Sequence, residues 1–226
     1  MASKPRLLDL TSFYHVYNCG VDKRAVFLSD YDYTRFISAC IYYLYDQSIC
    51  YSQYLDLSSE AKKDYLIRNP RGKENLRVII ICYCLMPNHF HFLIKQARYG
   101  GMSVFLSDVV NSYTRYFNRK NERFGALFQG PYKSKNISEV GSLLQVSRYI
   151  HLNPFGLKTE LSDEDIVKYP YSSYACWIGG REDKLVGRKE LSRWVTSGSG
   201  KQSYKEFVES KLDKNISGGI ESLVLE

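Results

Sequence analysis

The stretch YCLMPNHFHFLI at residues 83–94 consists of two short apolar runs joined by Pro87 and Asn88. This dipeptide favours a turn, so the two runs are expected to pair as adjacent antiparallel strands. After the turn, His89 and His91 alternate with two phenylalanines. Because side chains alternate between the faces of a strand, both imidazoles are predicted to leave one face and both phenyl rings the other.

The paired histidines have two interpretations. Two imidazoles side by side on a rigid strand provide half of a metal site. Alternatively, His89 and His91 are surface histidines on a half-exposed strand. The chain has only four histidines, and two of them lie in this motif. That concentration favours the metal site, although the motif alone leaves both interpretations open.

Length and composition limit the architecture and the class of partner. A chain of 226 residues with 44% hydrophobic residues predicts one large domain with a real core, or one domain with an appendix. The net charge of +7 favours a polyanionic partner, with nucleic acid before a membrane surface. The sequence contains no internal repeat, no P-loop and no dinucleotide-binding fingerprint.

Cysteine usage and the first residues indicate a compartment. The six cysteines form no Cys-x-x-Cys pair, and Cys82 and Cys84 are expected to be buried thiols, with a metal role as the alternative. Residues 1–6 contain no apolar signal region, and no apolar run is long enough to span a bilayer. Reduced thiols and a cytoplasmic location are therefore expected.

The chain before the histidine motif predicts a strand, a helix and an insertion. Residues 13–18 are β-branched and aromatic and form the expected first strand, in which His15 is either a partly buried histidine or a neighbour of the paired histidines. Ser29 or Asp30 can cap a helix that begins near Tyr31. The polar residues 46–76 are predicted to be a peripheral insertion with one short helix.

The chain after the motif predicts a helix with an aromatic face. Strands are expected at residues 76–85 and 88–95, followed by a break at Gly100. Ser103 can then cap a helix whose apolar residues recur at helical spacing and are expected in the core: Phe105, Val109, Tyr113, Tyr116 and Phe117.

Basic residues gather between positions 115 and 135, where Glu122 is the only acid. Interleaved tyrosine and phenylalanine make this pattern typical of a groove for a nucleic-acid backbone, with a solvated basic face as the alternative. Residues 132–135 are predicted to be a fourth strand or an ordered loop. The candidate phosphate contacts are Arg115, Arg119, Lys133 and Lys135.

A further helix carries a phenol and an amide at a helical spacing. Asn136 and Glu139 resemble a capping box at its start, and Pro154 ends it at Asn153. Tyr149 and Asn153 are four residues apart and are therefore expected on one helix face. Next to metal-binding histidines, this pair would complete a chemical site.

The remaining chain is less informative. Residues 169–174 are predicted to be a turn with aromatic packing, helices are expected near 188–195 and 204–212, and the end from residue 217 is expected to be disordered. The predicted division is a core domain at residues 1–178 and a helical extension at 179–226.

These motifs together resemble a known family. The motif LMPNHFHFLI at 85–94, YFN at 116–118, residues 125–129 and YIHLNP at 149–154 occur in the order found in the REP-associated tyrosine transposases. These proteins are relatives of the small single-tyrosine insertion-sequence transposases among the HUH endonucleases. The resemblance covers roughly residues 12–178.

The resemblance implies an α+β, ferredoxin-like fold in which an antiparallel sheet carries helices on one side. It implies that His89, His91 and Asn153 bind a divalent metal ion, Mg²⁺ or Mn²⁺, and that Tyr149 is the nucleophile. The implied partner is single-stranded or hairpin DNA, cut and rejoined through a 5′-phosphotyrosine. The oligomeric state is left open between monomer and homodimer.

Three departures from the family pattern, two alternative functions and one open question accompany this expectation. The 46–76 insertion is long, Gln129-Gly130-Pro131 replaces a more usual arginine after glycine, and Phe155 stands where valine is usual. The alternatives are a domesticated hairpin-binding protein without cleavage, and a metal-dependent hydrolase that uses water. A third question is whether the protein serves an autonomous element or acts on chromosomal palindromes.

Overall fold

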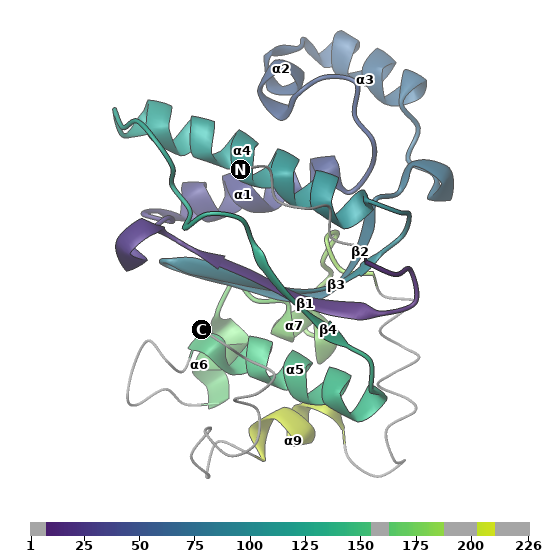
Figure 1. Ribbon diagram of the computed structural model, residues 1–226, viewed down its shortest axis with the longest axis vertical. Helices are drawn as coiled ribbons and strands as arrows, with labels where there is room; N and C mark the ends of the chain where they lie inside the picture. The colour runs from purple at the N-terminus through teal and green to yellow at the C-terminus, as the bar shows by residue number, and fades with distance from the viewer. Residues whose placement is uncertain (1–7, 155–162, 188–202, 211–226) are drawn as a thin grey trace.

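The computed structural model describes residues 8–154, 163–187 and 203–210, and their core is one antiparallel sheet of four strands (Figure 1). The strand order is β2-β3-β1-β4. The strands are β1 (Phe13–Cys19), β2 (Val78–Met86), β3 (His89–Gln96) and β4 (Lys133–Ile137). With α1 (Asp30–Tyr43) between β1 and β2, and α4 (Gly101–Lys120) between β3 and β4, the order is βαββαβ, which is ferredoxin-like.

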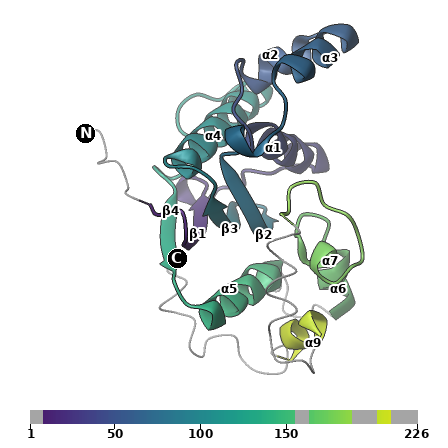
Figure 2. The ribbon, with the colours of Figure 1, turned by 90° about the vertical axis from the view of Figure 1, so that its right-hand side faces the viewer.

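Helices cover both faces of this sheet (Figures 1 and 2). The helices α1 and α4 pack together on one face, as expected for this fold class. The helix α5 (Val140–Leu152) lies across the other face and contacts β2 and β3. The expected α+β fold with an antiparallel sheet is therefore confirmed. The expectation of helices on one side of the sheet describes the α1–α4 layer, and α5 adds a layer on the other side.

The alternation in β3 divides the sheet as the sequence predicts. The rings of Phe90 and Phe92 are completely buried and pack against Phe36 of α1 and Phe105 of α4, with ring centroids 5.4–6.5 Å apart. The histidines therefore face α5. Burial of four such aromatic side chains removes a large apolar area from water and fixes the register of the hairpin.

Two predicted helix caps are wrong, and backbone geometry gives the reason. The helix α4 begins at Gly101 after Gly100, whose positive φ of 72° suits a residue without a Cβ, so Ser103 lies inside the helix. Asn136 belongs to β4, where it pairs with Tyr14, and α5 begins after Glu139 instead. A left-handed glycine overrides the cap signal at Ser103, and strand pairing overrides it at Asn136.

The 46–76 insertion forms two α-helices instead of one. These are α2 (Tyr51–Asp56) and α3 (Ser59–Arg68), and Ser58 caps α3 by accepting a hydrogen bond from the Ala61 amide. Short 3-10 turns occur at η1 (Val21–Lys23) and η2 (Lys73–Asn75). The insertion is anchored to α1 where the Tyr42 ring packs on Tyr51, Tyr54 and Tyr65.

The later segments cover the open edge of β2 and the outer side of α5. Residue Ser173 donates its amide to Tyr83 O, and Leu85 donates its amide to Tyr171 O, so this segment satisfies edge groups of β2. The helices there are α6 (Asp163–Lys168), α7 (Tyr174–Trp177) and α9 (Tyr204–Glu209). The last matches the helix predicted near 204–212, whereas 188–195 and the end from 217 lie outside the described residues.

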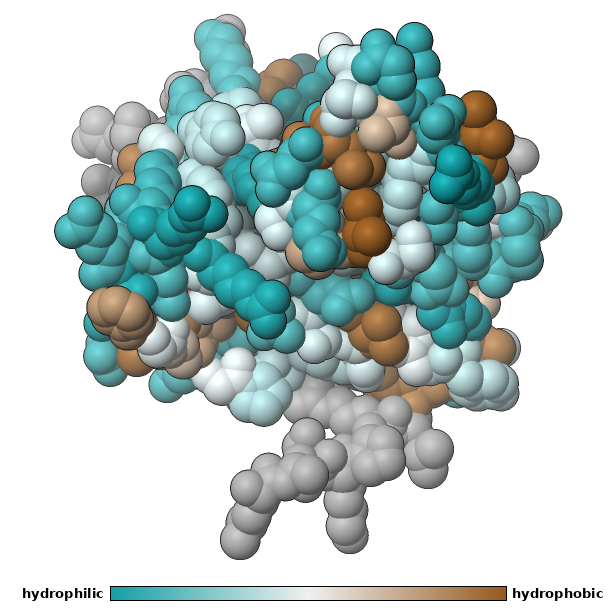
Figure 3. Space-filling model, turned by 90° about the horizontal axis from the view of Figure 1, so that it is seen from above, coloured by the Kyte–Doolittle hydropathy of each residue, from teal (hydrophilic) through white to brown (hydrophobic). Residues whose placement is uncertain are grey.

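Two further features concern the apolar character of the helices and of the surface. Among the helices of the described ranges, none combines the length and apolar character needed to cross a bilayer. Seen from the side of α2, α3 and α4, the surface is mainly hydrophilic and is interrupted by small apolar groups (Figure 3).

Candidate active site

The histidine face of the sheet brings residues from all four strands together. Directly paired residues share a face, so Tyr17 of β1 lies beside His91 on one side and Lys133 on the other. Cys84 of β2 continues this row beyond His91. The helix α5 passes over these residues and supplies Tyr149 and Asn153.

The turn before His89 is held by the segment that follows β1. The Pro87 carbonyl accepts hydrogen bonds from the amides of Val26 and Phe27, at 2.7 and 3.0 Å. The amide of Gly20 donates to the Asn88 carbonyl at 2.8 Å. The turn that carries His89 is therefore fixed by backbone contacts before any ligand binds.

Asn88 determines which nitrogen of His89 carries the proton. The Asn88 Nδ2 donates to Lys23 O at 3.3 Å, which turns Oδ1 toward His89. This Oδ1 lies 2.6 Å from His89 Nδ1 and must accept, so the proton is on Nδ1. In the neutral ring, the lone pair of His89 is then on Nε2.

The lone pair of His89 faces a second acceptor, the side chain of Asn153. Asn153 donates from Nδ2 to Tyr149 O at 3.1 Å, so its Oδ1 points to the histidines. This Oδ1 lies 3.4 Å from His89 Nε2. Two acceptors that face each other at this distance are arranged for a cation.

His91 presents a third acceptor atom. It is 1% exposed, and burial, with the neighbouring His15 and His89, holds its pKa well below the ordinary value, so the ring is neutral. His91 Nδ1 lies 2.9 Å from His15 Nε2, while within the described residues His91 Nε2 is buried without a hydrogen-bond partner. A lone pair on His91 Nε2 requires the proton on Nδ1, donated to His15 Nε2, and His15 then carries its own proton on Nδ1.

The predicted nucleophile packs on the same histidines. The ring of Tyr149 meets His91 edge-on, with centroids 5.6 Å apart, and meets His15 at 6.0 Å. The helical spacing places Tyr149 one turn before Asn153, as predicted. The predicted metal ligands and the predicted nucleophile of one chain therefore lie together: His89, His91, Asn153 and Tyr149.

The donor set fits a divalent ion held by two imidazoles and one amide oxygen. Within the described residues, no group of three histidine, cysteine, aspartate or glutamate side chains could hold a metal. The buried Nε2 of His91 and the facing acceptors of His89 and Asn153 are nevertheless the atoms such an ion needs. Burial raises the pKa of the Cys84 thiol, and its Sγ lies 3.6 Å from Met86 Sδ, as expected for a buried thiol.

The structure separates the four predicted phosphate contacts into two pairs. Lys133 and Lys135 pair with Tyr17 and His15, so they lie on the histidine face at the edge of the sheet. Lys133 Nζ lies 5.6 Å from the Tyr17 ring centroid. Arg115 and Arg119 instead extend from α4, on the opposite side of the sheet.

The tyrosines of α4 make structural hydrogen bonds on the other side of the sheet. Tyr113 and Tyr116 of α4 hydrogen-bond to Val26 O and to the Asp32 carboxylate, respectively, across the sheet from the histidines. Arg148 packs on Phe207 of α9, away from Tyr149. Of Tyr113, Tyr116 and Tyr149, only Tyr149 therefore lies on the histidine face.

His151, within the same helical motif, has a structural role. Its two ring nitrogens lie 2.8 Å from the hydroxyls of Tyr204 and Ser173. Complete burial lowers its pKa to about 3. His151 therefore joins α5 to α9 and to the segment along β2 as a neutral ring.

Of the two residues beside the site, the sequence leaves His15 open as a neighbour of the paired histidines and does not identify Asn88 as a partner of His89. The alternation of residues 13–19 places His15 on one strand face, but only the pairing of β1 with β3 sets it beside His91. The sequence gives Asn88 a turn role alone. Its side chain reaches His89 because the turn is folded back on residues 20–27.

Comparisons with known proteins agree with this architecture. The family model described as "Transposase IS200 like" matches residues 57–153, which include His89, His91, Tyr149 and Asn153. No curated protein matches the chain.

A solved structure described as a REP-associated tyrosine transposase bound to a REP hairpin is similar in fold. Its TM-score is 0.54 at 13% identity, and the match covers 82% of this chain and 90% of that one. The resemblance predicted from the sequence is therefore confirmed: residues 57–153 match the IS200-like transposases, and the chain has the fold of a REP-associated tyrosine transposase.

Proposed function

We propose that the protein is a single-tyrosine strand transferase that cuts and rejoins single-stranded DNA next to a hairpin. The observation that carries this proposal is the packing of Tyr149 on His91, whose Nε2 is buried without a hydrogen-bond partner among the described residues, one helical turn from the Asn153 Oδ1 that lies 3.4 Å from His89 Nε2. The IS200-like family match and the hairpin-bound neighbour support DNA as the substrate.

In the proposed reaction, the Tyr149 oxygen attacks a phosphorus atom of the strand. A bond from this oxygen to phosphorus forms, the bond to the 3′ oxygen breaks, and that oxygen leaves as a 3′-hydroxyl after taking a proton. The product is a 5′-phosphotyrosine, which keeps the energy of the phosphodiester bond. A second 3′-hydroxyl can reverse the step and join strands without ATP.

His89, His91 and Asn153 would hold the divalent ion, Mg²⁺ or Mn²⁺. When bound, this ion would act as a Lewis acid that polarises a non-bridging phosphate oxygen and stabilises the negative charge that develops on it. The imidazole and amide donors suit Mn²⁺ better than Mg²⁺, while cellular abundance favours Mg²⁺.

The other residues of the face have supporting roles in this proposal. Lys133 and Lys135 offer positive charge to the strand at the open edge, and within the described part of the chain neither forms a salt bridge. Asn88 keeps the proton of His89 on Nδ1, and in this proposal His15 accepts a hydrogen bond from Nδ1 of His91. Because Tyr149 packs on the histidines of its own chain, the proposed site is complete in one protomer.

A hairpin-binding protein without cleavage is the second candidate. The observation against it is that a pure binder has no need for three convergent acceptors beside a tyrosine. A hydrolase that uses water would need no tyrosine over His91. Both alternatives differ from the transferase in whether DNA becomes covalently attached.

The decisive experiment mixes the protein with end-labelled single-stranded hairpin DNA and Mn²⁺ or Mg²⁺, followed by a denaturing gel. We expect a metal-dependent protein–DNA adduct for the wild type and none for Tyr149→Phe or His89→Ala. Tyr116→Phe is the matched control, since it removes a phenol on the other side of the sheet, and it is expected to keep the adduct.

Other outcomes select the alternatives. Cleavage without an adduct, retained in Tyr149→Phe, would establish the water-dependent hydrolase. Tight binding of the hairpin without cleavage by any variant would establish the binding protein.

A further inference from the structure

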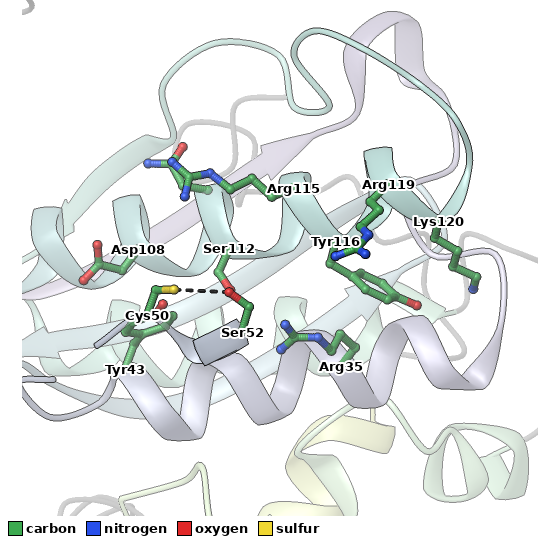
Figure 4. Close-up of a pocket in the computed structure, with 11 residues that line it drawn as sticks. Arg35, Tyr43, Cys50, Ser52, Asp108, Ser112, Arg115, Tyr116, Arg119 and Lys120 are labelled. Atoms are coloured by element: carbon green, nitrogen blue, oxygen red, sulfur yellow. Dashed lines mark hydrogen bonds between the residues drawn. The ribbon is translucent and has the colours of Figure 1, made fainter. Parts of the chain in front are cut away.

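A cavity lined by several charged and hydroxyl-bearing side chains lies across the sheet from Tyr149, between α1, α4 and the start of α2 (Figure 4). Its volume is about 640 Å³. Arg35 enters it from α1, Arg115 and Arg119 from α4, and Ser52 from the insertion. None of these residues takes part in the transferase site described above.

Arg35 is a buried cation, and no carboxylate within the described ranges forms a salt bridge with it. The residue is 8% exposed, and its guanidinium lies 4.1 Å from the Tyr51 ring centroid and 5.4 Å from that of Tyr116. Among the described residues, its Nη1 is buried and has no hydrogen-bond partner. A buried charged donor without a partner is costly, so this position indicates that an anion completes it.

The neighbouring charges leave the cavity strongly positive. Asp108 is bound by Arg77 at 2.7 Å, and Lys120 is bound to the buried Asp32 at 2.7 Å. Arg115 and Arg119 form no salt bridge with any residue that the structure describes. In this part of the chain, three arginines without acidic partners therefore line one cavity.

The chemistry and size of the cavity indicate a phosphate group. Guanidinium groups bind phosphate oxygens through paired N–H donors, which makes arginine the preferred residue for this purpose. The hydroxyls of Ser52, Ser112 and Tyr43 add neutral donors at the same walls. A volume of about 640 Å³ is in the range of sites that hold a molecule of nucleotide size.

We propose that this cavity is a second phosphate-binding site, which takes a phosphate of the DNA outside the bond that is cut. The identity of the ligand as DNA rests on the proposed function, whereas the phosphate chemistry rests on the arginines alone. The 46–76 insertion, through Cys50 and Ser52, closes one side of the site. It would therefore anchor the strand across the sheet from Tyr149.

Cys50 provides a built-in reporter for occupancy. Only Cys19 and Cys50 are partly exposed, while the other four cysteines are buried. Cys50 lines the cavity, and its hydrogen bond with Ser52 is the main cause of a lowered pKa. Cys19 pairs with His89 and so reports on the transferase face.

The experiment measures the initial rate of alkylation of each cysteine by iodoacetamide, using the full chain and peptide mass spectrometry. The probes are inorganic phosphate, single-stranded oligothymidylate and a DNA hairpin with a single-stranded flank. We expect a several-fold slower reaction of Cys50 with the DNA probes. Protection by phosphate alone as well would identify a site for free phosphate groups, and protection only by DNA would identify a strand site.

Variants connect the protection to the arginines. The double change Arg115→Gln/Arg119→Gln alters exposed side chains and is expected to abolish the protection of Cys50 while keeping that of Cys19. Arg35→Gln should have the same effect, and Arg68→Gln on exposed α3 is the matched control with normal protection. Protection of Cys50 by no probe, or unchanged protection in the double variant, would overturn the proposal.

The two proposals fail separately. If no adduct forms on Tyr149 but DNA still protects Cys50 in an arginine-dependent way, the phosphate site stands without the transferase. If the adduct forms and Cys50 reacts at its free rate, the transferase stands and the second site does not.

Discussion

His15 Nε2 and His91 Nδ1 lie 2.9 Å apart and link β1 to β3 beneath Tyr149. The contact joins residues 76 positions apart in the sequence. A metal ion on His91 Nε2 requires that His91 Nδ1–H donates this hydrogen bond and that His15 Nε2 accepts it. This is the type of outer hydrogen bond that orients a metal-binding imidazole.

His15→Phe is expected to weaken Mn²⁺ binding roughly 10–100-fold, because the accepting nitrogen beside His91 is removed while an aromatic ring is kept. The measurement is Mn²⁺ affinity by titration calorimetry without DNA, with circular dichroism as the check on folding. His15 would have no orienting role if a folded His15→Phe bound Mn²⁺ with wild-type affinity.

Asn153→Ala and Asn153→Asp are expected to change the metal affinity in different directions. Alanine removes the Oδ1 that faces His89 Nε2 and should lower metal affinity, whereas aspartate keeps an oxygen there and adds a negative charge, so affinity should be kept or raised. Both changes remove the hydrogen bond from Nδ2 to Tyr149 O, which makes them matched. Equal metal affinity in the two variants would exclude Asn153 as a ligand.

Lys133→Gln/Lys135→Gln is expected to weaken single-stranded DNA binding at every sequence tested, because these side chains offer charge on the histidine face. The slope of log affinity against log salt should decrease by about 0.7 for each phosphate that the wild-type lysines neutralise. The control is Lys63→Gln/Arg68→Gln on exposed α3, which removes the same charge elsewhere. An identical salt slope in both double variants would show that Lys133 and Lys135 contribute only net charge.

Acidification is expected to destabilise the protein through His151. Its pKa is about 3 when folded, against 6.5 for the exposed group, so the unfolded chain binds the proton more readily. Stability is therefore retained above pH 6.5 and decreases as the pH falls from 6.5 toward 3, by at most about 1.4 kcal/mol per pH unit for one such group.

The check is the free energy of urea unfolding between pH 7.5 and 5 for the wild type and His151→Gln. The variant is expected to be less stable at pH 7.5, since the bonds to Tyr204 and Ser173 are altered, and to show a shallower decrease with acid. His91 is also buried with a lowered pKa, so a smaller slope should remain. A variant with the wild-type slope would rule out His151 as a source of the acid sensitivity.

The sequence by itself determined the strand that carries the two histidines and the helix that carries Tyr149 and Asn153. The alternation at residues 89–92 placed both histidines on one face because a strand repeats every two residues, and Pro154 fixed the end of the helix that carries Tyr149 and Asn153. Those signals are local, and they do not depend on what lies across the fold.

Only the tertiary structure decided the rest. The pairing of β1 with β3 brought His15 to His91, packing of α5 across the sheet turned Asn153 toward His89, and the α1–α4 layer separated Arg115 and Arg119 from Lys133 and Lys135. The caps predicted at Ser103 and Asn136 were wrong because strand pairing and a left-handed glycine took precedence. A run of basic residues in a sequence does not show which side of the sheet each side chain faces. The register between distant segments such as β1 and β3 is set by burial of their shared apolar faces.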